Sequence, residues 1–328
     1  MSLMDDYIRI QYGDQMYRIP NRWELISNDY NYQQLVKDII LMSEGKLSPA
    51  MVRINYICRY FGWNYKKIKD EDAFANLVML AEQVTFIFQI SYPNNDEALQ
   101  GLDDYSYSLC KRIPPERLSG ITLAKVLKRL DYRFTLDLCF CRQFMPYLTV
   151  DGKHYTGYTI STSFDTLSTS LTALQFIEAR QLVNQGEKML PLMAAILYHP
   201  FPYTSESAHK RAESFKAVPR DKLYAISLNF QAFVNFLFTK TRYSILTAGR
   251  EIKSSAISTG ALESLYSLSA DGYGDVTQVE RMGLLQYLTI LRKKVIESVR
   301  SLNAAKMELV DIEKETGLPL SIIKQIIL

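Results

Sequence analysis

The chain has 328 residues, of which 48% are hydrophobic and 22% are charged, as in a globular protein that buries a core of its own. The net charge of +3 is too small to indicate a nucleic-acid-binding protein by itself, and no apolar run reaches the ~18 residues that a membrane-spanning helix requires. The first residues, MSLMDDY, lack the basic and apolar pattern of a secretion signal. We therefore expect a cytoplasmic protein without membrane contact, of roughly two domains by its length.

The first expected element is a β-hairpin over residues 7–19. Apolar and polar residues alternate there around a Gly-Asp pair, and such a pair supplies the positive φ angles of a tight turn. A helix follows, for which we expect Asn31 to be the N-cap and Gln34 to be its reciprocal partner. Trp23 stands between hairpin and helix and is expected to pack one onto the other.

A connector occupies residues 93–145. It is polar, acidic at first and broken by the pair Pro114-Pro115, which is typical of a loop or linker. An amphipathic helix is expected over residues 121–134, with leucine and valine on one face and basic residues on the other. A surface helix with solvated lysines is the preferred interpretation, and a helix that faces nucleic acid is the alternative.

A second copy of the hairpin and helix begins at residue 147. Residues 147–160 alternate around an Asp-Gly pair, and Phe164 corresponds to Trp23 at the same offset, with the same expected packing role. Thr172 and Gln175 then form a predicted capping box at the start of the next helix. This order of elements predicts an internal duplication, and the alternative is two unrelated segments with common cap and turn residues.

The C-terminal region follows the glycine-rich stretch 269–275. Its apolar residues recur every three or four positions, which predicts a helical stripe of interaction residues: Leu284, Leu288, Leu291, Val295, Val299 and Leu302. An unbroken helix of ~40 residues would extend roughly 60 Å, too far for its own domain to cover. We therefore expect the stripe to contact a second copy of the chain or another protein. The alternative is two packed helices that are broken near Asn303.

No group of residues has the spacing of a catalytic or metal site. The three histidines, His154, His199 and His209, lack the i, i+4 spacing of a helical zinc site. The four cysteines include a C-x-C pair but no C-x-x-C pair, and we expect all four to be reduced thiols. No phosphate-binding loop or nucleophile elbow occurs. We accordingly assign no catalytic residue, no cofactor and no metal.

These elements predict a mainly α protein with small β-hairpins, an α+β fold with an internally duplicated hairpin–helix–helix unit and a long C-terminal helical region. We expect four segments along the chain. They are a first hairpin-helical repeat over 1–92, a linker with an amphipathic helix over 93–145, a second hairpin-helical repeat over 146–268 and a C-terminal helical region over 269–328.

Three stretches carry a resemblance to known proteins. IPNRWELIS in the first copy, and SLTALQFIEARQLV followed by LPLMAAILYHPF in the second, resemble tail-region proteins of phages and prophages of gut Bacteroidetes. The resemblance covers residues 7–61 and 147–202. It implies a role in virion assembly, either in the cytoplasm of the host cell or within the virion, and it supplies no catalytic residue.

The sequence thus favours a non-enzymatic helical interaction protein of tail or virion assembly, in a structural or chaperone role. Its expected partners are other proteins or further copies of itself, and no membrane or small-molecule partner is inferred. One alternative is an enzyme with a dispersed active site that no motif reveals. The other is a nucleic-acid-binding protein that uses the helix-turn-helix-like residues 311–328, where Lys324 is the only basic residue of the second helix.

Overall fold

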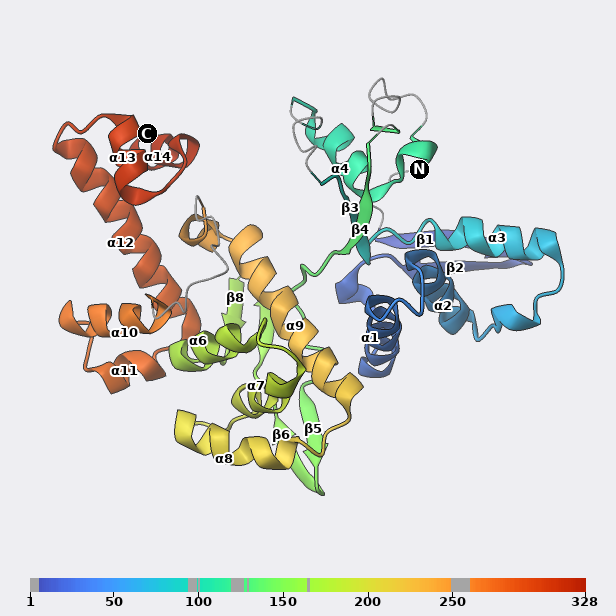
Figure 1. The fold of residues 1–328 in the computed structure, drawn as a ribbon, viewed down its shortest axis with the longest axis horizontal. Coiled ribbons are helices and arrows are strands. Elements are labelled where there is room, and N and C mark those ends of the chain that lie inside the picture. The colour runs from blue at the N-terminus through green and yellow to red at the C-terminus, as the bar shows by residue number, and fades with distance from the viewer. Residues whose placement is uncertain are drawn as a thin grey trace. The chain divides into compact units, whose positions relative to one another are not determined.

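The computed structural model describes residues 6–93, 99, 101–118, 127–128, 130–163, 166–248 and 260–328. The chain divides into two compact units, Met1–Leu138 and Cys139–Leu328, each of which is described by itself. Helices dominate both units, and the strands of the described residues form four separate two-stranded antiparallel sheets (Figure 1). The prediction of a mainly α protein with small β-hairpins is confirmed.

The first unit combines small sheets with helices that pack against them. Its elements are β1 (Tyr7–Tyr12), β2 (Gln15–Pro20), α1 (Asp29–Ser43), α2 (Pro49–Phe61), α3 (Glu71–Ala81), β3 (Phe88–Ser91), α4 (Asp104–Arg112) and β4 (Arg133–Leu136), with 3-10 turns at Trp23–Leu25, Tyr65–Lys67 and Pro115–Arg117. β1 and β2 form a hairpin, whereas β3 pairs with the distant β4. The β3–β4 sheet therefore closes a long excursion of the chain that contains α4 (Figure 1).

The second unit begins with two hairpins and continues in helices. Its elements are β5 (Tyr147–Val150), β6 (Lys153–Thr156), β7 (Ile160–Ser163), β8 (Thr166–Thr169), α6 (Ala173–Leu182), α7 (Leu190–Leu197), α8 (Ser205–Phe215), α9 (Arg220–Thr239), α10 (Gly260–Ala270), α11 (Val276–Arg281), α12 (Leu284–Ala304), α13 (Leu309–Thr316) and α14 (Leu320–Ile327), with 3-10 turns at Glu187–Met189 and Arg242–Leu246. α7 packs on α6, α8 and α9, and its residues 193–197 are all buried. This helix is therefore a central element of the core of its unit.

Both predicted hairpins are present. In the first, Ile8 lies opposite Ile19, and both side chains are buried. In the second, the turn consists of Asp151 and Gly152, whose φ angles of 48° and 74° lie in the left-handed region that hairpin turns require. Alternation and turn chemistry together were sufficient to locate the two hairpins.

The similarity between residues 17–27 and 158–168 does not extend to their structure. The first stretch holds the end of β2 and a 3-10 turn, whereas the second forms most of the hairpin β7–β8. Pro20 ends the pairing of β2 because proline cannot donate to a strand ladder, while the Ser- and Thr-rich second stretch pairs with itself. The order hairpin, helix, helix still occurs in both units, as β1–β2 with α1 and α2 and as β7–β8 with α6 and α7. The duplication stays a prediction, and Phe164 lies outside the described residues.

The N-cap of α1 is Asn28, so the prediction that Asn31 caps this helix is wrong. The Asn28 side chain accepts a hydrogen bond of 2.9 Å from the Asn31 backbone N–H. Asn31 is thus in the first turn, where its side-chain amide donates to Ser27 Oγ at 2.8 Å, and Gln34 lies deeper in the helix. The earlier cap is favoured because Asn28 has an extended backbone and Asp29 places a negative charge in the first turn.

The predicted capping box at the start of α6 is confirmed. Thr172 Oγ1 accepts from the Gln175 backbone N–H at 3.3 Å, and Gln175 Oε1 accepts from the Thr172 backbone N–H at 3.2 Å. Both residues are buried, and Gln175 Nε2 donates to the carbonyl oxygen of Ile196 at 3.1 Å. The box therefore also joins α6 to α7.

Trp23 is buried in the first unit, with 4% of its surface exposed. Its ring packs edge-on against Tyr32 of α1 and Phe86, at centroid distances of 6.4 and 5.1 Å. Its Nε1 donates a hydrogen bond of 2.7 Å to the carbonyl oxygen of Asp137. Trp23 therefore joins α1 to the segment before β3 and to the residue that follows β4.

We expect Trp23→Ala to lower the free energy of unfolding by ~3–5 kcal/mol, because it removes a buried aromatic ring and leaves a cavity. Chemical denaturation followed by circular dichroism measures this change. Tyr30→Ala is the control, since Tyr30 is 63% exposed in the same unit and its loss should change stability by less than ~0.5 kcal/mol. A loss below about 1 kcal/mol for Trp23→Ala would contradict the packing role.

The predicted interaction stripe lies on α12 and is covered by the chain itself. Leu284 and Leu288 are buried at the start of the helix, and Leu291 is half-buried. Further along, Val299 is buried in a cluster against which Val295 and Leu302 also pack, and the other buried members of that cluster are Ile245, Ile312, Leu318 and Ile323. The expectation that the stripe is left uncovered is therefore wrong.

The stripe is covered because the chain reverses direction after α12. The helix ends at Ala304, which confirms the alternative of a break near Asn303. Lys306 adopts a φ angle of 62° in the connection, and α13 and α14 then pack back onto α12 (Figure 1). The apolar faces of these two short helices close the core that a single long helix would have exposed.

We expect Val299→Asp to lower the free energy of unfolding by about 3–5 kcal/mol, because it places an unpaired charge in the α12–α14 core. Hydrogen exchange of α13 and α14 should show the loss of protection directly. Ser298→Asp is the matched control, since its neighbouring position on the same helix is exposed. If Val299→Asp instead dissolved an oligomer while α13 and α14 stayed protected, the intramolecular assignment of the stripe would be wrong.

Candidate ligand-binding pocket

The first unit contains a cavity of about 500 Å³. Its lining residues are Tyr7, Ile8, Asn21, Ala50, Arg53, Met79, Glu82, Gln83, Thr85, Arg112, Ile113, Pro114, Glu116, Arg117, Tyr132 and Phe134. They come from β1, the residue after β2, α2, the ends of α3 and α4 with the segments that follow these two helices, and β4 with the residue before it. Apolar walls with a few polar groups among them are typical of sites that hold small molecules or short chain ends.

Helix α2 places the central side chain of this pocket. The helix begins at Pro49, with Ser48 as N-cap and Ser48 Oγ accepting from the Met51 backbone N–H at 3.3 Å. It ends at Gly62, whose φ of 68° is the left-handed conformation of a helix C-cap. Between these ends one face of the helix is buried, and Arg53 lies on that face.

The Arg53 guanidinium is buried, with 5% of the residue exposed. It lies over the rings of Phe134 and Phe88, with its central carbon 4.9 and 5.5 Å from their centroids. Its Nε and Nη2 atoms have no hydrogen-bond partner among the described residues. A buried N–H group without a partner is costly, and the cost is greater for a charged group. Arg53 lines the cavity, but its two unpaired nitrogens are themselves buried, so a ligand in the cavity reaches them only when side chains of the wall move.

The other two arginines of the pocket are paired. Arg112 donates to the carbonyl oxygen of Thr85 at 2.9 Å and to Asp137 Oδ2 at 3.0 Å. Arg117 contacts the carboxylate of Glu82. Arg53 forms no such ion pair with any acid of the described residues, although the negative charge of Glu82 acts on it at longer range. The pocket thus holds one buried cation whose charge is not neutralised by direct contact.

Burial lowers the pKa of Arg53 to about 10, and attraction to Glu82 opposes this shift. The guanidinium consequently remains protonated at neutral pH, so the pocket keeps its positive charge there. Desolvation favours the neutral form, whereas an anion in the cavity would favour the charged form. A bound anion would therefore relieve the cost of burying Arg53.

Further polar groups fix the wall of the pocket. Asn21 Nδ2 donates to Thr85 Oγ1 at 3.2 Å, and Asn21 Oδ1 accepts from the Thr85 backbone N–H at 3.0 Å. The side-chain oxygen of Gln83 is buried and has no donor among the described residues. At the exposed edge, Tyr132 donates to Glu116 at 3.2 Å. The pocket therefore combines two unused donors on Arg53 with one unused acceptor on Gln83.

None of the interaction or structural residues predicted from the sequence lines this pocket, although Pro114 of the expected connector does. Arg53 carried a signal nonetheless, because it interrupts the apolar run MVRINYICRYF. Helical spacing of three and four residues places it with Tyr56 and Ile57 on the apolar face. No acidic residue lies three or four positions away along the helix to pair with it. A lone arginine on a buried helix face is the pattern that would have drawn attention to this site.

The second unit carries a polar arrangement that bears on the enzyme alternative. His199 Nδ1 lies 2.6 Å from the carbonyl oxygen of Pro200, and His199 Nε2 contacts Ser207 Oγ. Burial lowers the pKa of His199, which favours the neutral ring. A base oriented by a third group beside a hydroxyl is the geometry of an activated nucleophile. Neither residue lines the basic concavity between α8 and β6, whose lining includes Lys153, Lys210 and Arg211.

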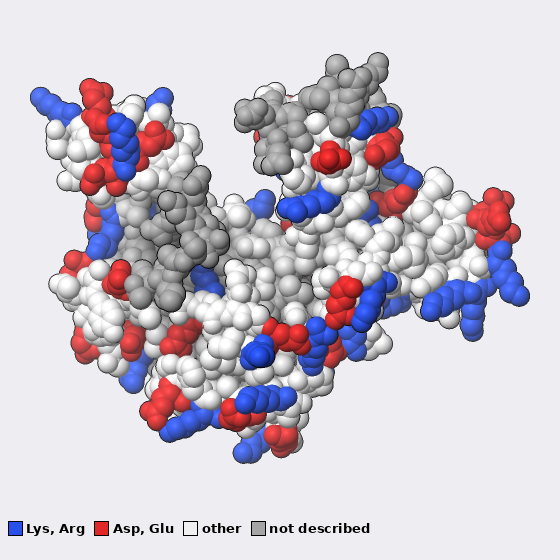
Figure 2. Space-filling model, in the orientation of Figure 1, with Lys and Arg blue, Asp and Glu red and all other residues white. Residues whose placement is uncertain are grey.

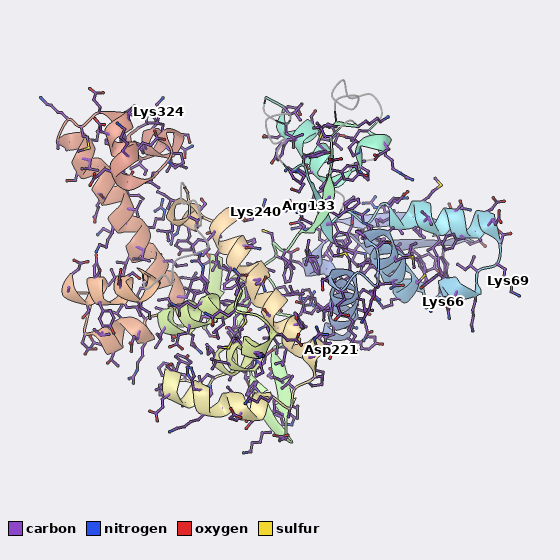
Figure 3. All side chains as sticks on the ribbon, viewed as in Figure 1. Lys66, Lys69, Arg133, Asp221, Lys240 and Lys324 are labelled. Carbon is purple, nitrogen blue, oxygen red and sulfur yellow. The ribbon has the colours of Figure 1, made fainter. Side chains whose placement is uncertain are left out.

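The charges give no footprint for nucleic acid on the face drawn in Figure 2. Basic and acidic residues of the described chain are interspersed there, rather than gathered into an area of one sign. Lys324 is exposed on α14, the second helix of the helix-turn-helix-like segment (Figure 3). One lysine supplies little of the electrostatic attraction on which DNA affinity depends. Half of the basic helix expected over 121–134 lies outside the described residues, and the expectation is wrong at its end, where Arg133 and Phe134 belong to β4.

No helix of the described residues is long and apolar enough to cross a membrane, and no group of three or more His, Cys, Asp or Glu side chains among them could hold a metal ion. The four cysteines form no disulfide with one another. Comparison of the chain with protein-family models, curated proteins and solved structures found no match in any of the three.

Proposed function

We propose that this chain is a non-enzymatic binding protein whose first unit holds an anionic group of its partner or ligand at Arg53. The observation that carries the proposal is the buried guanidinium at the wall of the cavity, with Nε and Nη2 unpaired. Buried charges in proteins are normally paired or hydrogen-bonded. A partner that displaces the wall beside Arg53 would supply the acceptors that these two buried donors lack in the free protein.

The aromatic contacts alone do not offset the cost of burying the Arg53 charge, whereas a bound anion would. Cation–π contacts with Phe88 and Phe134 offset part of the desolvation, by up to ~2 kcal/mol each in buried sites. The effective cost of burying an ion is several kcal/mol, so a shortfall remains. Charge-assisted hydrogen bonds are about twice as strong as neutral ones and would offset it.

The biological setting of this binding is proposed from the sequence resemblance. Residues 7–61 and 147–202 resemble tail-region proteins of phages and prophages, which supports a role in virion assembly as a structural component or a chaperone. Binding at Arg53 is compatible with that role, because assembly proteins act by holding parts of other proteins. The α12 stripe no longer supports it, since the chain covers that stripe itself.

We expect a polyatomic anion to stabilise the protein through Arg53. Acetate, benzoate, phosphate and sulfate replace chloride at constant ionic strength, and Tm is measured by scanning calorimetry on the full chain. At least one of them should raise Tm by about 2–4 °C in the wild type, because a ligand of the folded state alone stabilises that state. The rise should be lost in Arg53→Gln and kept in Arg9→Gln, an exposed arginine of the same unit. An equal rise in all three proteins, or none in the wild type, would refute the site.

The assembly setting has a separate test that does not depend on the pocket. We expect the genes on either side of this one to encode tail or capsid proteins, because phage assembly genes are grouped by the structure they build. Inspection of the genomic neighbourhood decides the matter. Neighbours with no relation to virions would leave the binding proposal standing and remove its proposed setting.

A further inference from the structure

We infer that the group held at Arg53 is a single carboxylate that belongs to an apolar or aromatic molecule with a hydrogen-bond donor. This inference rests on the proposed binding function and specifies its ligand class. It follows from three properties of the pocket: the shape of the unused donor edge, the balance of charge around it and the composition of the remaining wall.

The donor edge fits a carboxylate. Nε and Nη2, the two unpaired atoms, lie on the same side of the planar guanidinium and direct their N–H groups in parallel. A carboxylate presents two oxygens at the matching separation and accepts both hydrogen bonds at once. A single-atom anion such as chloride sits between the two N–H groups and cannot align with both of them, which limits its affinity.

The charge balance favours one negative charge over two. Of the three arginines, Arg112 is paired with Asp137 and Arg117 with Glu82, which leaves Arg53. Glu116 contributes a negative charge at the edge, where it accepts a hydrogen bond from the neutral hydroxyl of Tyr132. A monoanion neutralises Arg53, whereas a phosphate dianion would add a second charge that Glu82 and Glu116 repel. The pocket is therefore suited to a carboxylate better than to a phosphate.

The rest of the cavity requires more than a carboxylate. Its volume of about 500 Å³ lies in the range that holds a molecule of drug size. Ile8, Ile113 and Phe134 supply apolar wall, and the buried oxygen of Gln83 requires a donor. One molecule meets the requirements of Arg53, the apolar wall and Gln83 if it carries a carboxylate, an apolar side chain and an N–H or O–H group. Both the C-terminal residue of a polypeptide and a free hydroxy or acylamino acid have this chemistry.

Isothermal titration of the full chain with matched probes tests the ligand class. N-acetylphenylalanine carries the carboxylate, the ring and the N–H, whereas N-acetylphenylalanine amide lacks only the charge. We expect the acid to bind at least ~10-fold more tightly than the amide, because the amide loses charge-assisted hydrogen bonds. Phenyl phosphate should also bind more weakly than the acid. Equal binding of acid and amide, or tighter binding of phenyl phosphate, would overturn the carboxylate assignment.

Variants assign the effect to the residues of the pocket. Arg53→Gln should weaken binding of the acid at least ~10-fold and leave binding of the amide unchanged. Arg53→Lys keeps the charge but lacks the two-pronged donor edge, so it should lose most of the affinity as well. Arg9→Gln should behave as the wild type. If Arg53→Gln does not fold, Arg53→Lys and the comparison of acid with amide still decide the question.

Two further probes show whether the carboxylate belongs to a polypeptide or to a free acid. The pattern of binding also shows whether a negative result concerns the ligand class or the site itself. If acetyl-Gly-Gly-Phe binds more tightly than N-acetylphenylalanine, the ligand is a polypeptide C-terminus. If acetyl-Gly-Gly-Phe does not bind but 3-(4-hydroxyphenyl)propanoate does, the ligand is a free acid. Tight phosphate binding that Arg53→Gln abolishes would overturn the carboxylate class but retain the proposed site. No binding of any probe, and no anion effect on Tm, would overturn both.

Discussion

The small size of the sheets is the constraint on which the structure depends. Each sheet of the described residues has two strands, and an isolated two-stranded hairpin is at best marginally stable in water. The apolar residues of these sheets, such as Ile8 and Ile19 in β1–β2 and Leu148 and Val150 in β5–β6, are therefore buried in cores that helices complete. Stability comes from helix packing on short strands, and aromatic side chains such as Trp23 provide much of the contact.

The pairing of two short strands from distant parts of the chain also shapes the pocket. β3 and β4 come from distant parts of the chain, and their pairing brings Phe88 beside Phe134. Both rings then face the Arg53 guanidinium of α2, so that a charged residue becomes part of a core. Arg112 ties the end of α4 to Thr85 and to Asp137, which fixes another side of the cavity. The binding proposal thus depends on packing that no single segment of the chain contains.

The C-terminal helices show why a pattern of apolar residues does not identify its partner. The stripe on α12 has the period of a contact surface, and its covering could come from a second chain or from the same chain. Ile312 and Ile323 of α13 and α14 cover it here, because the chain reverses after Ala304. The physical requirement that apolar surface be buried is met in both cases. The connection between the helices, rather than the stripe, decides which case applies.

Local signals in the sequence determined the helical class, the hairpins at 7–19 and 147–160 and the Thr172–Gln175 cap, because alternation, turn residues and capping act within a few residues. They misplaced the cap of α1 by one turn, since Asn28 and Asn31 are equally good caps and only the backbone distinguishes them. The β3–β4 pairing, the covering of α12 and the burial of Arg53 with two unpaired donors were decided by the tertiary structure alone. Each of these depends on contacts between residues far apart in sequence, whose free energy is set by the fold and not by the pattern around any one residue.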